Sequence, residues 1–505
     1  MPAVPPVIAL LSLVVALGLC APAAASPGQL ALVQDDPLLV QRGPEARDRA
    51  LDEMAGLGAD AVKVQLPWAA VTPGGPTRPV GFDGANIASY PDAPWLRFDG
   101  LVRAARARGL RVMVALAGPA PGWATAARGD AAGVDRPSPR EYARWVRVVG
   151  QRYSGRHYDT TGQWVPRVDL WTIWNEPNHP QFLLPLGRRD GRLVAPHLYR
   201  DLVRGAVDGL RRSGHAQDQI LWGELLPIGR GDTGARKTIK PIRFLREMFC
   251  VDGRWRAYRG RAARVRGCHR FRRLGGVTGF AYHPYTRQDG PAAREPTADD
   301  ATIRSLGRVA ATLDRAAARG QLARRGMGLH VTEFGYQSRP PDPNQTRLGR
   351  IPRFMAEAER LAWGNARVKT WSQYQLQDEP EVAAAAAEER YGLFQSGLRF
   401  ADGTQKPGVY DAYRSPFVVR VTGRSSVEVW GAARPLGPGG LVQVEERVGT
   451  GAYRAVAGGA LTTGAGGYFR SRLRLAGPRG RVLRATYVDQ GVVRATRITR
   501  AVGRR

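Results

Sequence analysis

The sequence predicts an α/β protein, a (β/α)8 TIM barrel followed by a small C-terminal antiparallel β-sandwich. Between about residues 28 and 415, eight short apolar runs alternate with amphipathic helical segments, which is the pattern of a parallel sheet. Eight strand–helix repeats favour a closed barrel over an open sheet. No GxGxxG motif follows the first apolar run, so the usual reason to expect a dinucleotide-binding sheet is missing.

The alternation of side chains within the apolar runs supports the barrel. The expected strands are residues 30–34, 61–66, 111–117, 168–174, 219–225, 277–282, 328–332 and 368–373. In the sixth run, Gly279, Ala281, His283 and Tyr285 fall on one face. A barrel interior that changes from small to polar side chains toward the C-terminal end of its strands explains this pattern.

Two of the helices between these strands have recognisable ends. Ser138 followed by Pro139 is typical of an N-cap and first helical residue, ahead of EYARWVRVVGQRY. Thr297 with Asp300 resembles a capping box, and the helix that follows is expected to end at Gly320.

The N-terminus reads as a cleaved export signal. Residues 7–19 form an apolar run that is short for a membrane span, and small residues (APAAAS) follow it. Leu19 is larger than the residue that lipoprotein sites usually carry before their cysteine, which argues against an anchor at Cys20. We therefore expect a signal at residues 1–26 and a secreted protein without stable membrane insertion.

After Pro416 short β-branched runs alternate with glycine-rich turns, which predicts the sandwich. The domains are expected at 27–416 for the barrel and 417–505 for the sandwich. Trp430, Tyr453 and Tyr468 are the candidates for carbohydrate binding on the sandwich, with plain packing as the alternative.

The composition argues against a nucleic-acid partner although the formal charge is +31. Lysine is nearly absent and the arginines are scattered, as a GC-rich genome produces, without zinc ligands or a helix-turn-helix pattern. Cys250 and Cys268 are the cysteines left after signal removal, and in an exported protein they are expected to form a disulfide. The arginine-rich stretch 254–273 is then a solvated loop that this disulfide pins.

Polar residues follow several expected strands at their C-terminal ends, where barrels carry their active sites. Glu176 follows the fourth strand and Glu333 the seventh. Two carboxyl groups that face each other across a barrel mouth are the arrangement that a retaining glycosidase needs. One protonates the leaving oxygen and the other attacks the anomeric carbon, with about 5–5.5 Å between them.

These residues lie in motifs of a known group. WNEP, residues 174–177, resembles the acid/base motif of the clan A glycoside hydrolases, and TEFG, residues 332–335, resembles their nucleophile motif. HPY, residues 283–285, is similar to the clan's His-x-Tyr, and Trp371 matches a tryptophan at the floor of the catalytic subsite. The resemblance covers roughly residues 29–414 and is closest to cellulase-type family 5 and xylosidase-like family 39.

The resemblance implies a role for each residue. Glu176 would be the general acid and then the base, and Glu333 the nucleophile of a double displacement. Asn175 would bind the sugar 2-hydroxyl, His283 would hold a hydroxyl or orient the acid, and Tyr285 would donate a hydrogen bond to Glu333. Trp371 would contact the sugar.

One position departs from the clan pattern. An arginine on the second strand often steadies the nucleophile in clan A, whereas this chain has Lys63, which lacks the bidentate fork. Glu224, in the fifth strand, is expected to have a structural or outer-subsite role.

The leading hypothesis is therefore a secreted, monomeric retaining β-glycosidase that acts on a polysaccharide or oligosaccharide. A catalytically inactive glycan-binding barrel and a transglycosylase are the alternatives. No metal or other cofactor is expected, because the histidines show neither HExxH nor HxH spacing and the cysteines form no zinc set.

Overall fold

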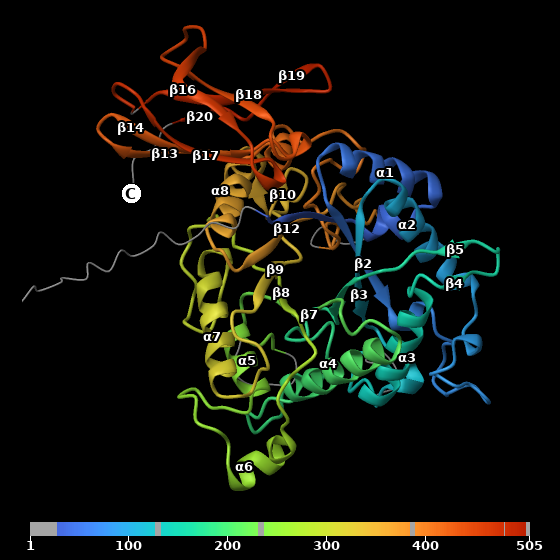
Figure 1. Cartoon of the computed structure of the whole chain (residues 1–505). Coiled ribbons are helices and arrows are strands. Elements are labelled where there is room, and N and C mark those ends of the chain that lie inside the picture. The colour runs from blue at the N-terminus through green and yellow to red at the C-terminus, as the bar shows by residue number, and fades with distance from the viewer. Residues whose placement is uncertain (1–27, 127–132, 231–236, 384–388, 479, 501–505) are drawn as a thin grey trace, which may run out of the picture.

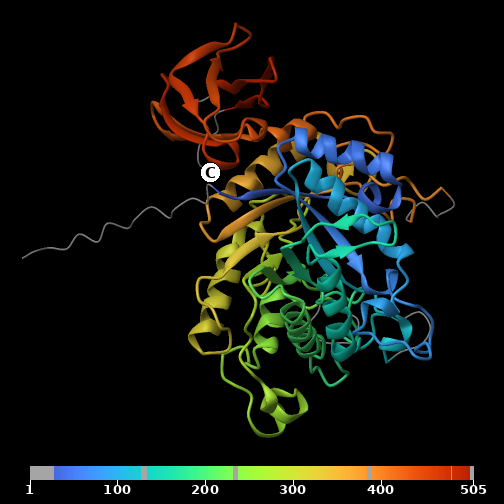
Figure 2. The same ribbon diagram turned by 45° about the vertical axis from the view of Figure 1, so that its right-hand side comes forward.

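The computed structural model of the 505-residue chain describes residues 28–126, 133–230, 237–383, 389–478 and 480–500. The expected signal at residues 1–26 lies outside the described residues. Within them, a barrel carries a smaller β domain at one end (Figures 1 and 2).

The barrel is closed and has eight parallel strands, as the sequence predicts. In chain order these are β1 (Leu30–Gln34), β2 (Ala61–Pro67), β3 (Arg111–Ala117), β6 (Leu170–Ile173), β7 (Gln219–Leu225), β8 (Gly279–Tyr282), β9 (Gly328–Val331) and β12 (Val368–Tyr374). Their order around the barrel follows the chain, and β1 closes the ring against β12. An inner layer of apolar side chains, such as Leu32, Met113 and Leu221, fills the barrel below its polar end.

Helices cover the outside of the barrel (Figure 1). They are α1 (Pro44–Gly56), α2 (Leu96–Ala107), α3 (Pro139–Arg152), α4 (Ala195–Arg212), α5 (Pro241–Met248), α7 (Leu306–Ala318), α8 (Ile351–Trp363) and α9 (Val409–Arg414), while the short α6 (Gly260–Val265) lies on a projecting loop. Short strand pairs, β4 (His157–Tyr158) with β5 (Trp164–Val165) and β10 (Ser338–Arg339) with β11 (Thr346–Arg347), lie in the connections. No helix among the described residues combines the length and apolar character needed to cross a bilayer.

The expected helix ends are partly confirmed. The Ser138 side chain caps α3 by accepting a hydrogen bond from the Glu141 amide, and the chain leaves α7 through Gly320, whose φ is +70°. The expected capping box is wrong, because α7 begins only at Leu306. The Asp300 carboxylate instead accepts hydrogen bonds from the Thr297 amide (3.0 Å) and hydroxyl (2.7 Å), which stabilise a turn before the helix.

The C-terminal domain consists of two antiparallel sheets, as predicted. One sheet contains β13 (Phe417–Gly423), β14 (Ser426–Ala432) and β17 (Tyr468–Arg474), and the other contains β15 (Leu441–Arg447), β16 (Arg454–Thr462), β18 (Val482–Asp489), β19 (Val492–Ala495) and β20 (Thr499–Arg500). Both sheets contribute to one apolar core, Val419 and Val429 from the first and Val444 and Leu483 from the second.

A buried contact joins the two domains. Trp363 at the end of α8 packs against Trp430 and Tyr468, with ring centroids 5.9 and 6.2 Å apart. Beside them the buried carboxylate of Glu359 accepts a hydrogen bond from the Tyr468 hydroxyl at 2.6 Å and pairs with Arg434. Trp430 and Tyr468 therefore pack against the barrel and do not form an exposed carbohydrate surface.

The predicted disulfide is present between Cys250 and Cys268. It closes the base of the arginine-rich loop that carries α6, and this loop projects from the barrel on the side opposite the β domain (Figure 1).

Candidate active site

A cavity of about 1030 Å³ opens at the C-terminal ends of the barrel strands. Its lining includes Asn175, Glu176, Tyr285 and Glu333, four of the residues that the sequence predicts. The cavity has room for a drug-sized or sugar-sized ligand, since ligand pockets typically measure about 300–1,000 Å³. The predicted residues thus meet at one place although they come from three different connections.

The backbone after β6 holds Glu176 in a conformation that is unusual for its residue type. Trp174 and Glu176 have φ values of +68° and +39°, a region that side chains other than glycine rarely adopt and that clusters at functional sites. The Glu176 amide donates to the Glu224 carbonyl at 3.0 Å. The Asn178 side chain donates to Leu226 O at 3.0 Å, which clamps the loop to the chain after β7.

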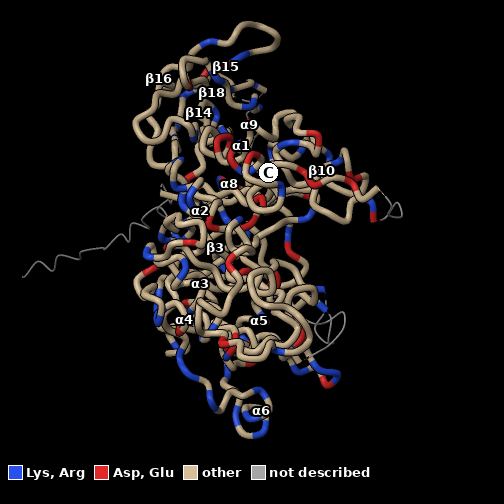
Figure 3. Tube along the Cα trace, turned by 90° about the vertical axis from the view of Figure 1, so that its right-hand side faces the viewer, with Lys and Arg blue, Asp and Glu red and all other residues tan. Residues whose placement is uncertain are grey.

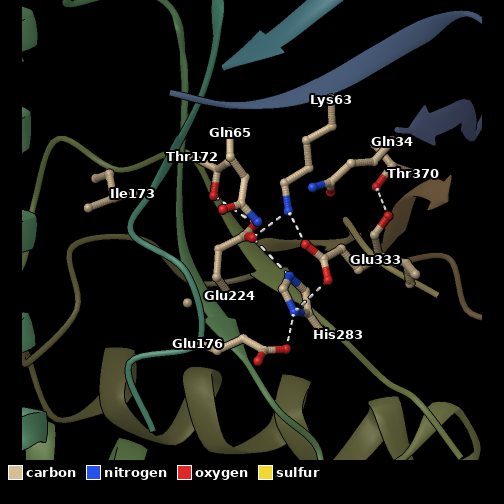
Figure 4. Close-up of polar contacts among 12 residues, drawn as sticks. Gln34, Lys63, Gln65, Thr172, Ile173, Glu176, Glu224, His283, Glu333 and Thr370 are labelled. Carbon is tan, nitrogen blue, oxygen red and sulfur yellow. Dashed lines mark hydrogen bonds and ion pairs between the residues drawn. The ribbon is translucent and has the colours of Figure 1, made fainter. Parts of the chain in front are cut away.

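A buried network of charged groups lies beneath the cavity (Figure 4). Lys63 Nζ lies 2.6 Å from Glu224 Oε2 and 3.1 Å from Glu333 Oε1. His283 Nε2 lies 2.8 Å from the same Glu224 oxygen, and the Thr172 hydroxyl donates to Glu224 Oε1 at 2.7 Å. Glu224 therefore anchors two cationic side chains beneath the cavity, and Lys63 also contacts Glu333.

His283 also connects the two candidate catalytic glutamates. Its Nδ1 lies 2.9 Å from Glu176 Oε1 and 3.4 Å from Glu333 Oε2. One carboxylate oxygen of Glu176 and one of Glu333 lie within 4.8 Å of each other. The two carboxyl groups are therefore close enough to contact the same bound ligand.

The two cations keep their protons because carboxylates surround them. Burial lowers the pKa of the His283 imidazole, but the carboxylates of Glu333 and Glu224 outweigh burial and raise this pKa to about 10. Burial is outweighed in the same way at Lys63, whose pKa lies above its usual range. Glu224 shows the reverse effect: burial raises its pKa, but Lys63 and His283 bring it well below the ordinary value.

Glu176 differs from these groups because it tends to retain a proton. Burial raises the pKa of its carboxyl group and repulsion from Glu333 adds to this, while His283 and Lys63 act in the opposite direction without cancelling it. With Glu176 protonated, the two cations are matched by the carboxylates of Glu224 and Glu333. Ionisation of Glu176 would add an unmatched negative charge to a buried site, which is the physical reason for the raised pKa.

Tyr285 and Asn175 complete the polar wall of the cavity. The Tyr285 hydroxyl donates to Glu333 Oε2 at 3.3 Å. Asn175 is 4% exposed, and its Oδ1 has no hydrogen-bond partner among the described residues. A buried acceptor without a partner at the wall of a cavity is available to a ligand hydroxyl.

The structure places Trp371 away from the cavity. In the register of β12 with β1, Ser372 pairs with the inward-facing Leu32, so Trp371 points outward. Its ring packs on Phe334 with centroids 4.9 Å apart, in the core between barrel and helices. Tyr374, three residues later, lines the cavity in its place.

Sequence reasoning also missed Asp36, which lines the same cavity at the end of β1. Its carboxylate accepts hydrogen bonds from Gln34 Nε2 at 2.8 Å and from the Gln65 amide at 2.6 Å. Burial raises the pKa of Asp36 to about 6 in spite of these donors. Its position two residues after the end of the first strand was the signal that could have found it.

Two clusters among the described residues have the spacing of metal ligands, but their chemistry does not suit a metal ion. His197 lies near Cys250 and Cys268, whose sulfurs are joined in the disulfide. In the second cluster, His283 with Glu176 and Glu333, both imidazole nitrogens lie within 3 Å of carboxylate oxygens. An imidazolium held in this way has no lone pair to give to a metal.

Comparison with protein-family models and with curated proteins finds no match for this chain. Its trace is similar to solved structures of low sequence identity. GH5_18 from Streptomyces cattleya in complex with GlcNAc is 18% identical over 77% of this chain and 80% of that chain, with a TM-score of 0.45. A monomeric β-xylosidase from Caulobacter crescentus CB15 is 14% identical over 91% and 96%, with a TM-score of 0.47. The β-glycosidase from the hyperthermophile Thermosphaera aggregans is 13% identical over 77% and 96%, with a TM-score of 0.47. These similarities carry no argument about function, which has to come from the site itself.

Proposed function

We propose that this protein is a secreted retaining β-glycoside hydrolase that cleaves O-glycosidic bonds of a polysaccharide or oligosaccharide. The observation that carries the proposal is the pair of opposed carboxyl groups, Glu176 and Glu333, within 4.8 Å of each other at the mouth of a barrel. One of the pair has a raised pKa and the other contacts a buried cation. Different environments give the two carboxyl groups different pKa values, so one can act as the acid and the other as the nucleophile.

In the first step, Glu176 donates its proton to the glycosidic oxygen and Glu333 attacks the anomeric carbon. The bond from this carbon to the leaving alcohol breaks as the bond to Glu333 forms, which leaves an ester between sugar and enzyme. Lys63 and Tyr285 hold the Glu333 carboxylate in place through 3.1 and 3.3 Å contacts. The cationic His283 fixes the Glu176 carboxyl group at 2.9 Å.

In the second step, water attacks the anomeric carbon and the Glu176 carboxylate accepts its proton. The ester bond breaks and Glu333 leaves as a carboxylate, so the configuration of the sugar is retained. A hydrogen bond between Asn175 and the sugar 2-hydroxyl would strengthen as positive charge develops on the ring.

A panel of aryl β-glycosides tests the proposal, with release of the aryl alcohol as the readout. Glu333→Gln should abolish turnover at unchanged circular dichroism, and a 2-fluoro glycoside should leave one sugar attached to Glu333 in the mass spectrum of the wild type. Unchanged turnover in Glu333→Gln would overturn the nucleophile assignment. Failure of every substrate and absence of an adduct would favour a silent glycan-binding barrel, and transfer to added sugar acceptors would favour a transglycosylase.

Export and the monomeric state belong to the same proposal. Export rests on the apolar run of residues 7–19 and the small residues after it. N-terminal sequencing of protein from a culture medium should find a start close to residue 26, and light scattering of that protein should give the mass of one chain.

A further inference from the structure

A second hollow, of about 400 Å³, lies between the start of α4 and the disulfide-closed loop that carries α6. It shares no lining residue with the active-site cavity. Guanidinium groups dominate its lining. They belong to Arg188, Arg192, Arg200, Arg204, Arg266 and Arg270. Figure 3 shows the concentration of basic residues at the α6 end of the molecule.

The positive charge of this hollow is only partly neutralised. Asp201 is the carboxylate in the lining, and it lies 3.7 Å from both Arg200 Nε and Arg204 Nη1. Arg192 pairs with Asp190, and Arg266 Nε lies 3.2 Å from Glu247 Oε2. Among the described residues, no carboxylate oxygen lies within 4.0 Å of Arg188 or Arg270. Elsewhere on this arginine-rich chain most such charges are scattered, whereas here they converge on one concave site.

One of these arginines is buried and already has protein partners. Arg200 is 3% exposed, and its Nη1 donates to Met248 O and contacts Cys250 Sγ, both at 3.2 Å. Its Nε makes no hydrogen bond with any described residue but lies 3.7 Å from the Asp201 carboxylate. Arg200 therefore adds positive charge to the wall of the hollow, and the arginines open to a ligand are the exposed Arg188 and Arg270.

The hollow is built from rigid parts. The Cys250–Cys268 disulfide fixes the loop, and the Phe271 ring lies 5.4 Å below the Arg200 guanidinium and 5.8 Å from that of Arg204. Helix α4 begins beside the hollow and has no acidic residue in its first turn, so the positive end of its dipole is not compensated there. A site that is preformed and positive loses little entropy when it binds an anion.

We propose that this hollow binds a phosphate group, either free or carried on a polymer. A phosphate offers several oxygens to several guanidinium forks at once, whereas a carboxylate is satisfied by one bidentate arginine. A hollow lined by six arginines, of which Arg188 and Arg270 have no carboxylate partner among the described residues, therefore fits phosphate better. On an exported enzyme such a site would hold the protein on phosphate-bearing polymer.

Calorimetric titration of the full chain with inorganic phosphate, and separately with polyphosphate, tests the proposal. The variant R188Q/R270Q removes two exposed arginines of the hollow, and R211Q/R212Q removes the same charge at the other end of α4. Phosphate should bind the first variant roughly tenfold more weakly or worse, since hydrogen bonds to charged groups are lost, and the second as it binds the wild type. Turnover of an aryl glycoside should be the same in both variants.

The outcomes separate the sources of the phosphate. A polymer ligand is supported if polyphosphate binds more tightly than inorganic phosphate and this binding depends on Arg188 and Arg270. Free phosphate is supported if the two bind with equal affinity. Equal weakening in the two variants would show diffuse attraction to a basic protein and overturn the proposal. Absence of saturable phosphate binding to the wild type would overturn it as well.

Discussion

Replacing His283 with glutamine should shift the pH at which the enzyme loses activity under basic conditions. The glutamine side chain keeps a hydrogen-bond donor but removes the positive charge whose nitrogen lies 2.9 Å from Glu176 Oε1. His283 counteracts the raised pKa of Glu176, so its removal should raise that pKa further. Because Glu176 has to be protonated in the proposed first step, we expect its ionisation to set the pH at which kcat/KM falls on the basic side of the profile.

The size of this shift follows from the contacts at the site. An adjacent opposite charge moves a carboxyl pKa by about 1–3 units. The glutamine amide still donates a hydrogen bond to Glu176, which replaces part of the lost stabilisation of its ionised form. We expect the basic limb to move up by about 1–2 pH units, with about 1.4 kcal/mol for each unit. His283 itself has a pKa of about 10 and stays charged at pH values well below 10, so its own titration does not cause the loss of activity that Glu176 ionisation produces.

The assay is a pH profile of kcat/KM on an aryl glycoside, with circular dichroism to confirm folding at each pH. His215→Gln is the matched control, since His215 is also buried and bonds to a carboxylate, Asp218, but lies outside the active-site cavity. The control should leave the limb in place. A basic limb that stays fixed or moves down in His283→Gln would refute the electrostatic argument.

Three further predictions concern residues in and around the cavity. Lys63→Met removes one of the two cations that pair with the buried carboxylates of Glu224 and Glu333, and it should lower the free energy of unfolding by about 3–5 kcal/mol. Urea denaturation should show no comparable loss for the exposed Lys369→Met, and an equal loss in both would contradict the prediction. Tyr374→Ala should raise KM several-fold with little loss of stability, because its ring lines the cavity. Trp371→Ala should cost about 3–5 kcal/mol of stability through the void it leaves, with KM unchanged; the opposite pattern would return Trp371 to the sugar site.

The barrel was predictable because the sequence pattern that specifies each strand is local and recurs eight times. Each apolar run has the length and alternation of a strand, and eight such runs leave few other ways to bury them. The paired glutamates followed from the same rule, since residues that end parallel strands meet at one end of the barrel. The cysteine pair was predictable because, without Cys20 in the expected signal, each remaining cysteine has only one possible partner.

The outward orientation of Trp371 could have been predicted from the sequence if the end of the eighth strand had been placed correctly. The eighth strand runs to Tyr374 rather than to residue 373. Counting inward positions back from Tyr374 in steps of two gives Ser372 and Thr370 and leaves Trp371 outside. The prediction was wrong because it matched a tryptophan by residue type without checking whether its side chain lies on the inward face of the strand.

The role of Glu224 was beyond the sequence because a backbone irregularity decides it. Strict alternation along QILWGEL places Glu224 on the face of Trp222, away from the barrel interior. The pairing of β7 with β8 shifts register between Gly223 and Leu225, and Gly223 and Glu224 have φ values of +121° and +50°. This bulge turns Glu224 inward to Lys63. The glycine at position 223 is a sign of such a bulge, but the sequence does not show which side chain the bulge turns inward.

The repulsion between the two catalytic carboxyl groups has a consequence for the timing of the proposed reaction. Once Glu333 is esterified to the sugar it no longer carries charge, so the influence that helped Glu176 keep its proton disappears. Lys63 and His283 remain, and their attraction then favours the ionised form of Glu176. The bond made in the first half of the cycle thereby prepares the side chain that must deprotonate water in the second half, without any movement of the backbone.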